Sequence, residues 1–199
     1  MINIFLFILI SSGCYLIGSI SFGRILSKFM TGVDITKVGS GNTGATNVLR
    51  NSGPKLGFTV LILDMLKSIL PVVILNQFNL FEAQGAIQFF ALLFVIGHCY
   101  PIYNKFKGGK GVATYVGILF SINILFGIIF GLVWIITYFI SKYSSLSSIL
   151  GSLSVPIYIF YVNGNNIIFF IIMFVLIFYT HRENIKRLIN KQETKTKIY

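Results

Sequence analysis

The residues from Gly39 to Arg50, Gly-Ser-Gly-Asn-Thr-Gly-Ala-Thr-Asn-Val-Leu-Arg, have the composition of an anion-binding loop in an otherwise apolar chain. Glycines let a backbone turn its N–H groups toward a ligand, and a helix N-terminus after such a turn attracts negative charge. We expect Asn42 or Thr43 to cap a short helix that runs toward Arg50 and stops at Gly53-Pro54. The same residue types are ordinary turn formers, so this stretch alone leaves a plain surface loop open.

A second loop, Lys107–Thr114, reads Lys-Gly-Gly-Lys-Gly-Val-Ala-Thr. Its flexible backbone donors surround a point charge, which suits a phosphate group. It is not a Walker A loop, because Lys110 is followed by Gly111 where that motif has Ser or Thr. A positively charged cytoplasmic loop with glycine hinges is the simpler alternative.

Two further polar segments complete the set, the serine-rich stretch 142–148 and the basic tail 181–187. The four segments together supply cations, glycine backbone, serines, a histidine and an asparagine, which suit small anionic substrates and phosphates above all. The few carboxylates do not favour acid–base catalysis by a carboxylate pair. No cluster of His or Cys suggests a metal site, and we expect no cofactor. His98, at the end of an apolar segment, is expected to be a packed or capping residue.

The elements that position these loops must be membrane helices. Of the 199 residues, 55% are hydrophobic and the mean hydropathy is +0.85, more apolar side chain than a soluble domain of this size can bury. The net charge of +11 would suggest nucleic acid in a soluble protein, but here the cations lie in loops. We therefore attribute them to positive-inside topology and anionic lipid, and expect no nucleic-acid partner.

Hydropathy and charge predict an all-α integral membrane protein that forms a single polytopic domain over residues 1–199. About seven spans are expected, with the N-terminus outside and the C-terminus cytoplasmic. The predicted spans are 2–22, 56–75, 86–99, 149–161 and 167–180, with two more in the apolar stretch 112–140 if it breaks near Asn123. The alternative is five spans, with 112–140 and 149–180 each crossing once. The start of the chain lacks the basic region of a signal peptide, so we expect the first segment to stay as an anchor.

Asp64 and Lys67 lie inside the second predicted span, three residues apart and therefore on one helix face. Charges within the membrane are costly, and they are usually paired or functional. A structural ion pair is the expected arrangement.

Three of these polar segments together resemble a known family. Gly39–Arg50, Lys107–Thr114 and the tail His181–Leu188 are similar, in order, spacing and membrane context, to the three cytoplasmic motifs of the bacterial acyl-phosphate:glycerol-3-phosphate acyltransferase family (PlsY type). The resemblance covers essentially the whole chain. Departures are peripheral: Lys191, where the family often has glycine, affects the tail most.

The resemblance implies a small enzyme of the bacterial inner membrane with its active site on the cytoplasmic face. Such an enzyme transfers an acyl group from acyl phosphate to the 1-hydroxyl of sn-glycerol 3-phosphate, giving lysophosphatidic acid and phosphate. It uses no cofactor, and we expect a monomer. The family lacks the His-x4-Asp motif of other glycerolipid acyltransferases, and no such motif occurs here.

Carried over by match, the resemblance also implies site residues. The catalytic set comprises Ser40, Arg50, Lys110, His181 and Asn184. The substrate-binding set comprises Gly39, Gly41, Asn42, Gly44, Thr46, Asn47, Lys107, Gly108, Gly109, Ser145 and Ser148. Direct attack by the glycerol hydroxyl is expected, with His181 or a substrate phosphate oxygen as the base. The alternatives are a small anion transporter, although no internal repeat is evident, and a non-catalytic membrane scaffold.

Overall fold

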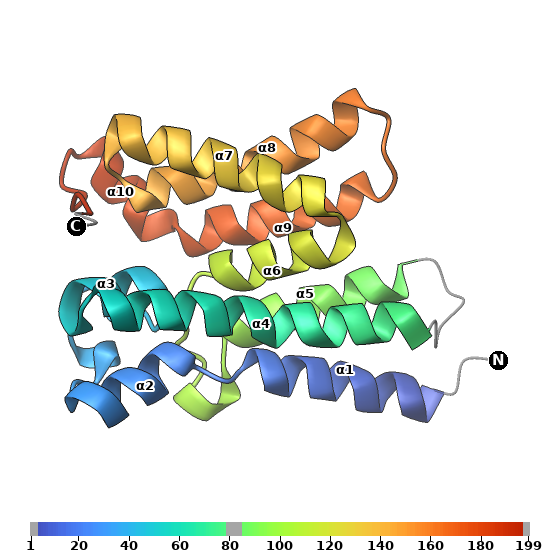
Figure 1. The fold of residues 1–199 in the computed structure, drawn as a ribbon, viewed down its shortest axis with the longest axis horizontal. Helices are drawn as coiled ribbons and strands as arrows, with labels where there is room; N and C mark the ends of the chain where they lie inside the picture. Colours follow the sequence, from blue (N-terminus) through green and yellow to red (C-terminus); the bar gives the residue numbers. More distant parts are fainter. Residues whose placement is uncertain (1–3, 79–84, 197–199) are drawn as a thin grey trace. The chain divides into compact units, whose positions relative to one another are not determined.

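The computed structural model describes residues 4–78 and 85–196, and the regular structure within them is helical (Figure 1). Most of the segment 76–85, between the second and third predicted spans, lies outside these residues. The chain divides into two compact units, Met1–Ile122 and Asn123–Tyr199. Each unit is described by itself below.

In its described residues, 4–78 and 85–122, the first unit contains six α-helices and two short 3₁₀ turns. The helices are α1 (Ile4–Gly18), α2 (Phe22–Thr31), α3 (Ala45–Ser52), α4 (Pro54–Phe78), α5 (Ala86–Cys99) and α6 (Val112–Ile122), and the 3₁₀ turns are η1 (Ile35–Lys37) and η2 (Ile102–Asn104). The first predicted span is not one continuous helix, because the backbone breaks at 19–21 and α2 begins at Phe22. This break places α2, with its cations, against the polar loops of the unit.

Small residues bring α1 and α5 into backbone contact. A methyl group at Gly18 would overlap the carbonyl of Phe94, and one at Gly97 would overlap the carbonyl of Tyr15. Close approach of this kind is how helices gain packing energy in lipid, where burial of apolar surface gives little. The glycines of the first span therefore serve helix packing.

The second unit contains α7 (Ile124–Ser141), α8 (Ser144–Tyr161), α9 (Ile167–Thr180) and α10 (Arg182–Ile189). The predicted break at Asn123 is confirmed, since its side chain accepts a hydrogen bond from the Leu125 amide and caps α7. Lys142, in the left-handed conformation with φ 64°, ends α7 and turns the chain into α8. Consequently the serines of 144–148 form the first turns of α8.

The apolar composition and the long apolar helices identify the chain as a multi-pass membrane protein. Five described stretches are long and apolar enough to cross a bilayer, and α9 with α10, bent by 61°, gives a sixth. The eleven-residue α6 is apolar but shorter. Helices stand at all seven predicted positions, although length alone qualifies only five or six stretches.

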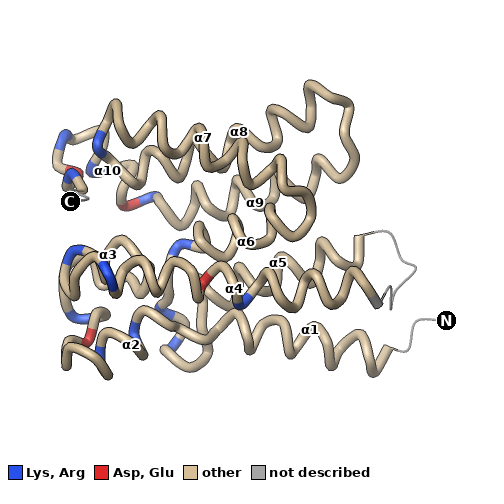
Figure 2. Tube along the Cα trace, in the orientation of Figure 1, with Lys and Arg blue, Asp and Glu red and all other residues tan. Residues whose placement is uncertain are grey.

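Lys and Arg gather at helix ends within each unit (Figure 2). In the first unit they lie around α2, α3 and the adjoining loops, and in the second around α10 and the turn between α7 and α8. Asp64 and Lys67 are the exception, because they lie within α4.

Candidate active site

One side chain, Asn47, holds the first glycine loop together. Its Nδ2 donates to the carbonyls of Ile35 and Val38 at 3.1 Å and of Asn42 at 2.9 Å, while its Oδ1 accepts from the Ser40 amide at 3.1 Å. Asn47 is buried in the first turn of α3 and is therefore shielded from competing water. These bonds fold residues 35–47 around one amide group, which places Asn47 in a structural role.

Gly39 and Gly41 take positive φ values of 57° and 69°, which glycine adopts without steric cost. A methyl group at Gly39 would also overlap the Oδ1 of Asn47. The expected side-chain cap by Asn42 or Thr43 is wrong: α3 begins after Gly44, which makes no side-chain cap. The reason is that the Asn42 amide turns back to the Oγ of Ser40, at 3.1 Å.

The remaining predicted residues of this loop lie near its surface. Ser40 is exposed, Thr46 is half-buried at the start of α3, and Arg50 is exposed in its last turn. The predicted stop after Arg50 is confirmed, because α3 ends at Ser52 and Gly53 has φ 97°. The hydroxyl of Ser40 and the guanidinium group of Arg50 are therefore carried by the first glycine loop and by α3, which follows it.

The second glycine loop lies on the end of α5. The amide of Gly109 donates to the carbonyl of His98 at 3.1 Å. A methyl group at Gly108 would overlap that carbonyl, and one at Gly109 would overlap the His98 ring at Nε2. Gly109 is buried, whereas Lys107 is exposed and Lys110 is half-buried. The two glycines thus let the loop approach His98 closely, and this contact fixes the position of the Lys110 backbone.

The first glycine loop contacts the start of α2, and the second is linked to it through Asn104. A methyl group at Gly23 would overlap the carbonyl of Thr43, in the first loop. The next residue, Arg24, donates to Asn104 Oδ1 at 2.5 Å, and Asn104 in turn donates to the carbonyl of Lys107 in the second loop. The structure therefore brings the two predicted motifs of the first unit to one helix N-terminus.

The Asp64–Lys67 ion pair is confirmed and is larger than expected. Lys67 Nζ donates to Asp64 Oδ1 at 2.7 Å, to the carbonyl of Ile20 at 2.9 Å and to His98 Nδ1 at 2.9 Å. All three ionisable side chains are at least 95% buried in side-chain area. His98 is a packed residue, as expected, and its partners come from α4.

In the second unit, Ser145 and Asn184 meet at a carboxylate that we did not predict. Glu193 Oε1 accepts from Ser145 Oγ at 2.9 Å and from Asn184 Nδ2 at 2.7 Å, and Oε2 accepts from Arg187 Nε at 2.8 Å. The Glu193 side chain is only 5% exposed. The tail thus folds back and joins α8 to α10 within this unit.

The charge state of Glu193 follows from these contacts. Burial acts to raise the pKa of its carboxyl, but the hydrogen bonds from Asn184, Arg187 and Ser145 outweigh that effect. They hold the pKa below its ordinary value of 4.5. The group is therefore a carboxylate at neutral pH.

His181 is buried at the junction of α9 and α10. Its Nδ1 lies 2.8 Å from the carbonyl of Ile177, and because a carbonyl only accepts, Nδ1 carries the proton. In the neutral ring the lone pair then lies on Nε2. This tautomer is the one that a hydrogen-bond acceptor or base for a substrate hydroxyl requires.

Ser148 lies apart from the Glu193 contacts. Its hydroxyl donates to the carbonyl of Ser144 at 2.8 Å and accepts from Trp134 Nε1 at 3.2 Å. The structure therefore places Ser145, but not Ser148, with Asn184.

Some of these polar residues escaped prediction, each for a different reason. Glu193 and Arg187 lie in a tail whose conformation the sequence left open, and only the three-way contact shows that they matter. His98 was visible as a buried histidine, but its pairing with Lys67 spans 31 residues. No local pattern encodes a contact of that separation.

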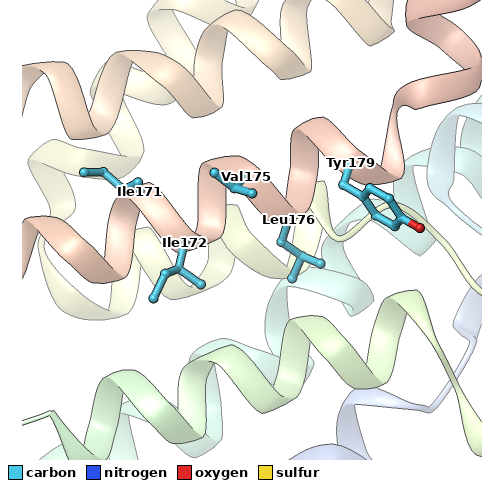
Figure 3. Close-up of a pocket in the computed structure, with 5 residues that line it drawn as sticks. All are labelled: Ile171, Ile172, Val175, Leu176 and Tyr179. Carbon is cyan, nitrogen blue, oxygen red and sulfur yellow. The ribbon is translucent and has the colours of Figure 1, made fainter.

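The α9 helix carries an apolar strip that leads toward His181. The side chains of the strip lie along the helix (Figure 3), and they are Ile171, Ile172, Val175, Leu176 and Tyr179. The strip ends at Tyr179, two residues before His181. Side chains two residues apart leave a helix in different directions, and accordingly Tyr179 is exposed whereas His181 is buried.

Comparison with known proteins agrees with these motifs. A family model described as glycerol-3-phosphate acyltransferase matches residues 8–191. A glycerol-3-phosphate acyltransferase of Pelagibacter ubique is 55% identical over 97% of this chain and 99% of its own length. One from Aquifex aeolicus is 41% identical over 90% and 93%.

Two solved structures are also similar along nearly the whole chain. Both are of PlsY (YgiH), an integral membrane glycerol 3-phosphate acyltransferase. Its glycerol 3-phosphate form has a TM-score of 0.89 at 37% identity, covering 96% of each chain. Its lysophosphatidic acid form has a TM-score of 0.87 at 38% identity, covering 95% of this chain and 94% of its own. Since family model, relatives and fold agree, this chain belongs to the glycerol-3-phosphate acyltransferase family and is a membrane enzyme that acylates glycerol 3-phosphate.

Proposed function

We propose that the acyl donor is acyl phosphate and that the acceptor atom is the 1-hydroxyl of sn-glycerol 3-phosphate, so that the products are lysophosphatidic acid and phosphate. The observation that carries the proposal is the pair of glycine loops at the start of α2, each bearing a cation, Arg50 or Lys110. Two anionic substrates need two cationic, donor-rich loops. An acyl chain dissolved in the bilayer fits the apolar strip on α9.

The site roles are proposals of the same kind. Arg50, Lys110 and the backbone donors of the loops, with Lys107, Thr46 and Ser145, bind the two phosphates. Ser40 hydrogen-bonds a phosphate or the acyl group without becoming acylated. Asn184 orients the glycerol hydroxyl, and His181 accepts from that hydroxyl at Nε2. The support for the last role is the proton on Nδ1, fixed by the Ile177 carbonyl.

The transfer is proposed to occur in one attack. The glycerol oxygen bonds to the acyl carbon, its proton passes to His181 Nε2, and the bond from that carbon to the phosphate oxygen breaks. Phosphate is a good leaving group, so no covalent enzyme intermediate is needed. Alignment of the reactants supplies up to about 7–11 kcal/mol in favourable cases. The cations stabilise the tetrahedral oxyanion and the departing phosphate.

The topology completes the proposal. Seven spans with the N-terminus outside, as the positive-inside rule predicts, put all four polar segments at the cytoplasmic face of the inner membrane. The two units then work as one domain over residues 1–199, in a monomer. Cysteine labelling from either side, at introduced positions 146 and 164, tests this arrangement: position 146 should be labelled from the cytoplasmic side and 164 from outside, and labelling of position 146 from outside would contradict it.

The decisive experiment uses purified protein in lipid with acyl phosphate and glycerol 3-phosphate, and follows phosphate and lysophosphatidic acid together. Equal yields of both products, absent with acyl-CoA, would support the donor. K110A should cut turnover by roughly 10² or more while the protein stays folded. Wild-type turnover in K110A would refute the role of Lys110, and a trapped acyl-Ser40 would refute direct transfer.

A further inference from the structure

We propose that Asp64, Lys67 and His98 act together as a positioning group for the Gly108–Lys110 loop of the acyltransfer site. The proposal rests on the proposed role of Lys110. It gives a function to three ionisable side chains that lie inside α4 and α5 and do not belong to either glycine loop. Charged groups at such depth are expensive, and they persist where they serve a site.

The contacts of Lys67 show what the group holds. Lys67 Nζ donates to Asp64 and to the Ile20 carbonyl, and it lies 2.9 Å from His98 Nδ1. The same ring nitrogen lies 3.6 Å from Asp64 Oδ1. Asp64 and Lys67 therefore fix the orientation of the His98 ring.

The fixed ring lies directly against the loop. Nε2 of His98 occupies the space that a side chain at Gly109 would need, and the His98 carbonyl accepts from the Gly109 amide at 3.1 Å. The loop thus contacts both the side chain and the backbone of His98. Lys110 follows immediately, so the place of its backbone is set by the place of His98.

The same ammonium group also ties down the other side of the site. Ile20 lies in the break between α1 and α2, where the helix no longer uses its carbonyl. Beyond this break, α2 contacts the first glycine loop at Gly23 and is linked to the second through the Arg24–Asn104 hydrogen bond. Lys67 therefore joins the start of α2 to the seat of the second loop, and a shift of one would displace the other.

A double-mutant cycle between positions 98 and 109 tests the contact. G109A puts a methyl group into the His98 ring, and we expect kcat/KM for glycerol 3-phosphate to fall on the order of 100-fold, as for a misplacement near 1 Å. H98A should lower it as well. In G109A/H98A the methyl group has room, so kcat/KM should recover at least roughly tenfold over G109A. G13A is the matched control, because a methyl group there meets nothing, and it should behave as wild type.

A second variant guards against loss of folding. D64N/K67M removes both charges at once and leaves no isolated buried ion. It should keep the wild-type gel-filtration profile and Trp134 fluorescence, yet raise KM for glycerol 3-phosphate at least roughly tenfold, because the His98 ring is no longer fixed. Independent effects of G109A and H98A, with wild-type kinetics in D64N/K67M, would overturn the proposal. Failure of the Lys110 role itself would show separately, in K110A.

Discussion

Removal of the Glu193 carboxylate should loosen the second unit by an amount that its contacts allow us to calculate. E193A deletes the acceptor of Ser145 and Asn184, and hydrogen bonds to a charged group contribute about 1.5–3 kcal/mol each. The lower end applies, since removing the carboxylate also removes its desolvation cost. Arg187 is 39% exposed, so its ion pair adds less than about 1 kcal/mol.

The expected destabilisation of E193A is therefore about 3–4 kcal/mol. At about 2–4 °C for each kcal/mol in a chain of this size, the Tm should fall by roughly 6–16 °C. E193Q should fall about half as far. It can keep Oε1 as an acceptor for Ser145 and Asn184, but its amide nitrogen faces the Arg187 donor.

The assay is thermal unfolding of the protein in lipid, followed by tryptophan fluorescence. Trp134 is the single tryptophan and lies in the second unit, stacked on Tyr138 with ring centroids 5.2 Å apart. E183Q is the matched control on α10. The Glu183 side chain is 59% exposed, and its ion pair, to Lys186 Nζ at 3.4 Å, is open to solvent. Its Tm should move by less than about 2 °C. If E193A also stayed within 2 °C of wild type, the three-way contact would not hold the tail.

Three further predictions concern the glycine loops and acid pH. N47D keeps the shape of Asn47 but cannot donate to the three carbonyls around it, so activity should fall on the order of 100-fold, measured as phosphate release. G39A and G32A both place alanine at a positive φ, but only the former overlaps Asn47; turnover should collapse in G39A alone, and equal loss in both would contradict the contact. The folded-state pKa of Glu193 is depressed, so its contribution is complete above the ordinary value of 4.5 and is lost as pH falls through the lower folded value. The Tm difference between wild type and E193Q should therefore stay constant above pH 4.5 and shrink only below it.

The sequence predicted the helices and the polar loops because both depend on local composition. Apolar runs of span length identify α4 and α5, and Asn123 could be recognised as a break because it interrupts an uncharged run. The break at 19–21 was missed, since the predicted span 2–22 ran through it to the start of α2. At this break the Ile20 carbonyl accepts a hydrogen bond from Lys67, 47 residues away in the sequence.

The site was predictable in its residue types and not in its internal bonds. The motif matches located Ser40, Lys110 and Asn184, but they could not show that Asn47 shapes its loop. They also could not show that Glu193 binds Ser145 across 48 residues. These bonds depend on tertiary placement, which neither propensity nor spacing encodes.

The backbone contact between α1 and α5 has a consequence for how the protein is made. Gly18 of α1 packs against the backbone of α5, and Gly97 of α5 packs against the backbone of α1. During synthesis, α1 leaves the ribosome well before α5. During that interval α1 lies in the bilayer without α5, and no contact with α5 fixes its tilt. A ribosome that stalls before α5 therefore releases an orphan helix, which membrane proteases that survey unassembled segments would remove. Nascent-chain crosslinking should detect the two helices together only after residue 97 has entered the membrane.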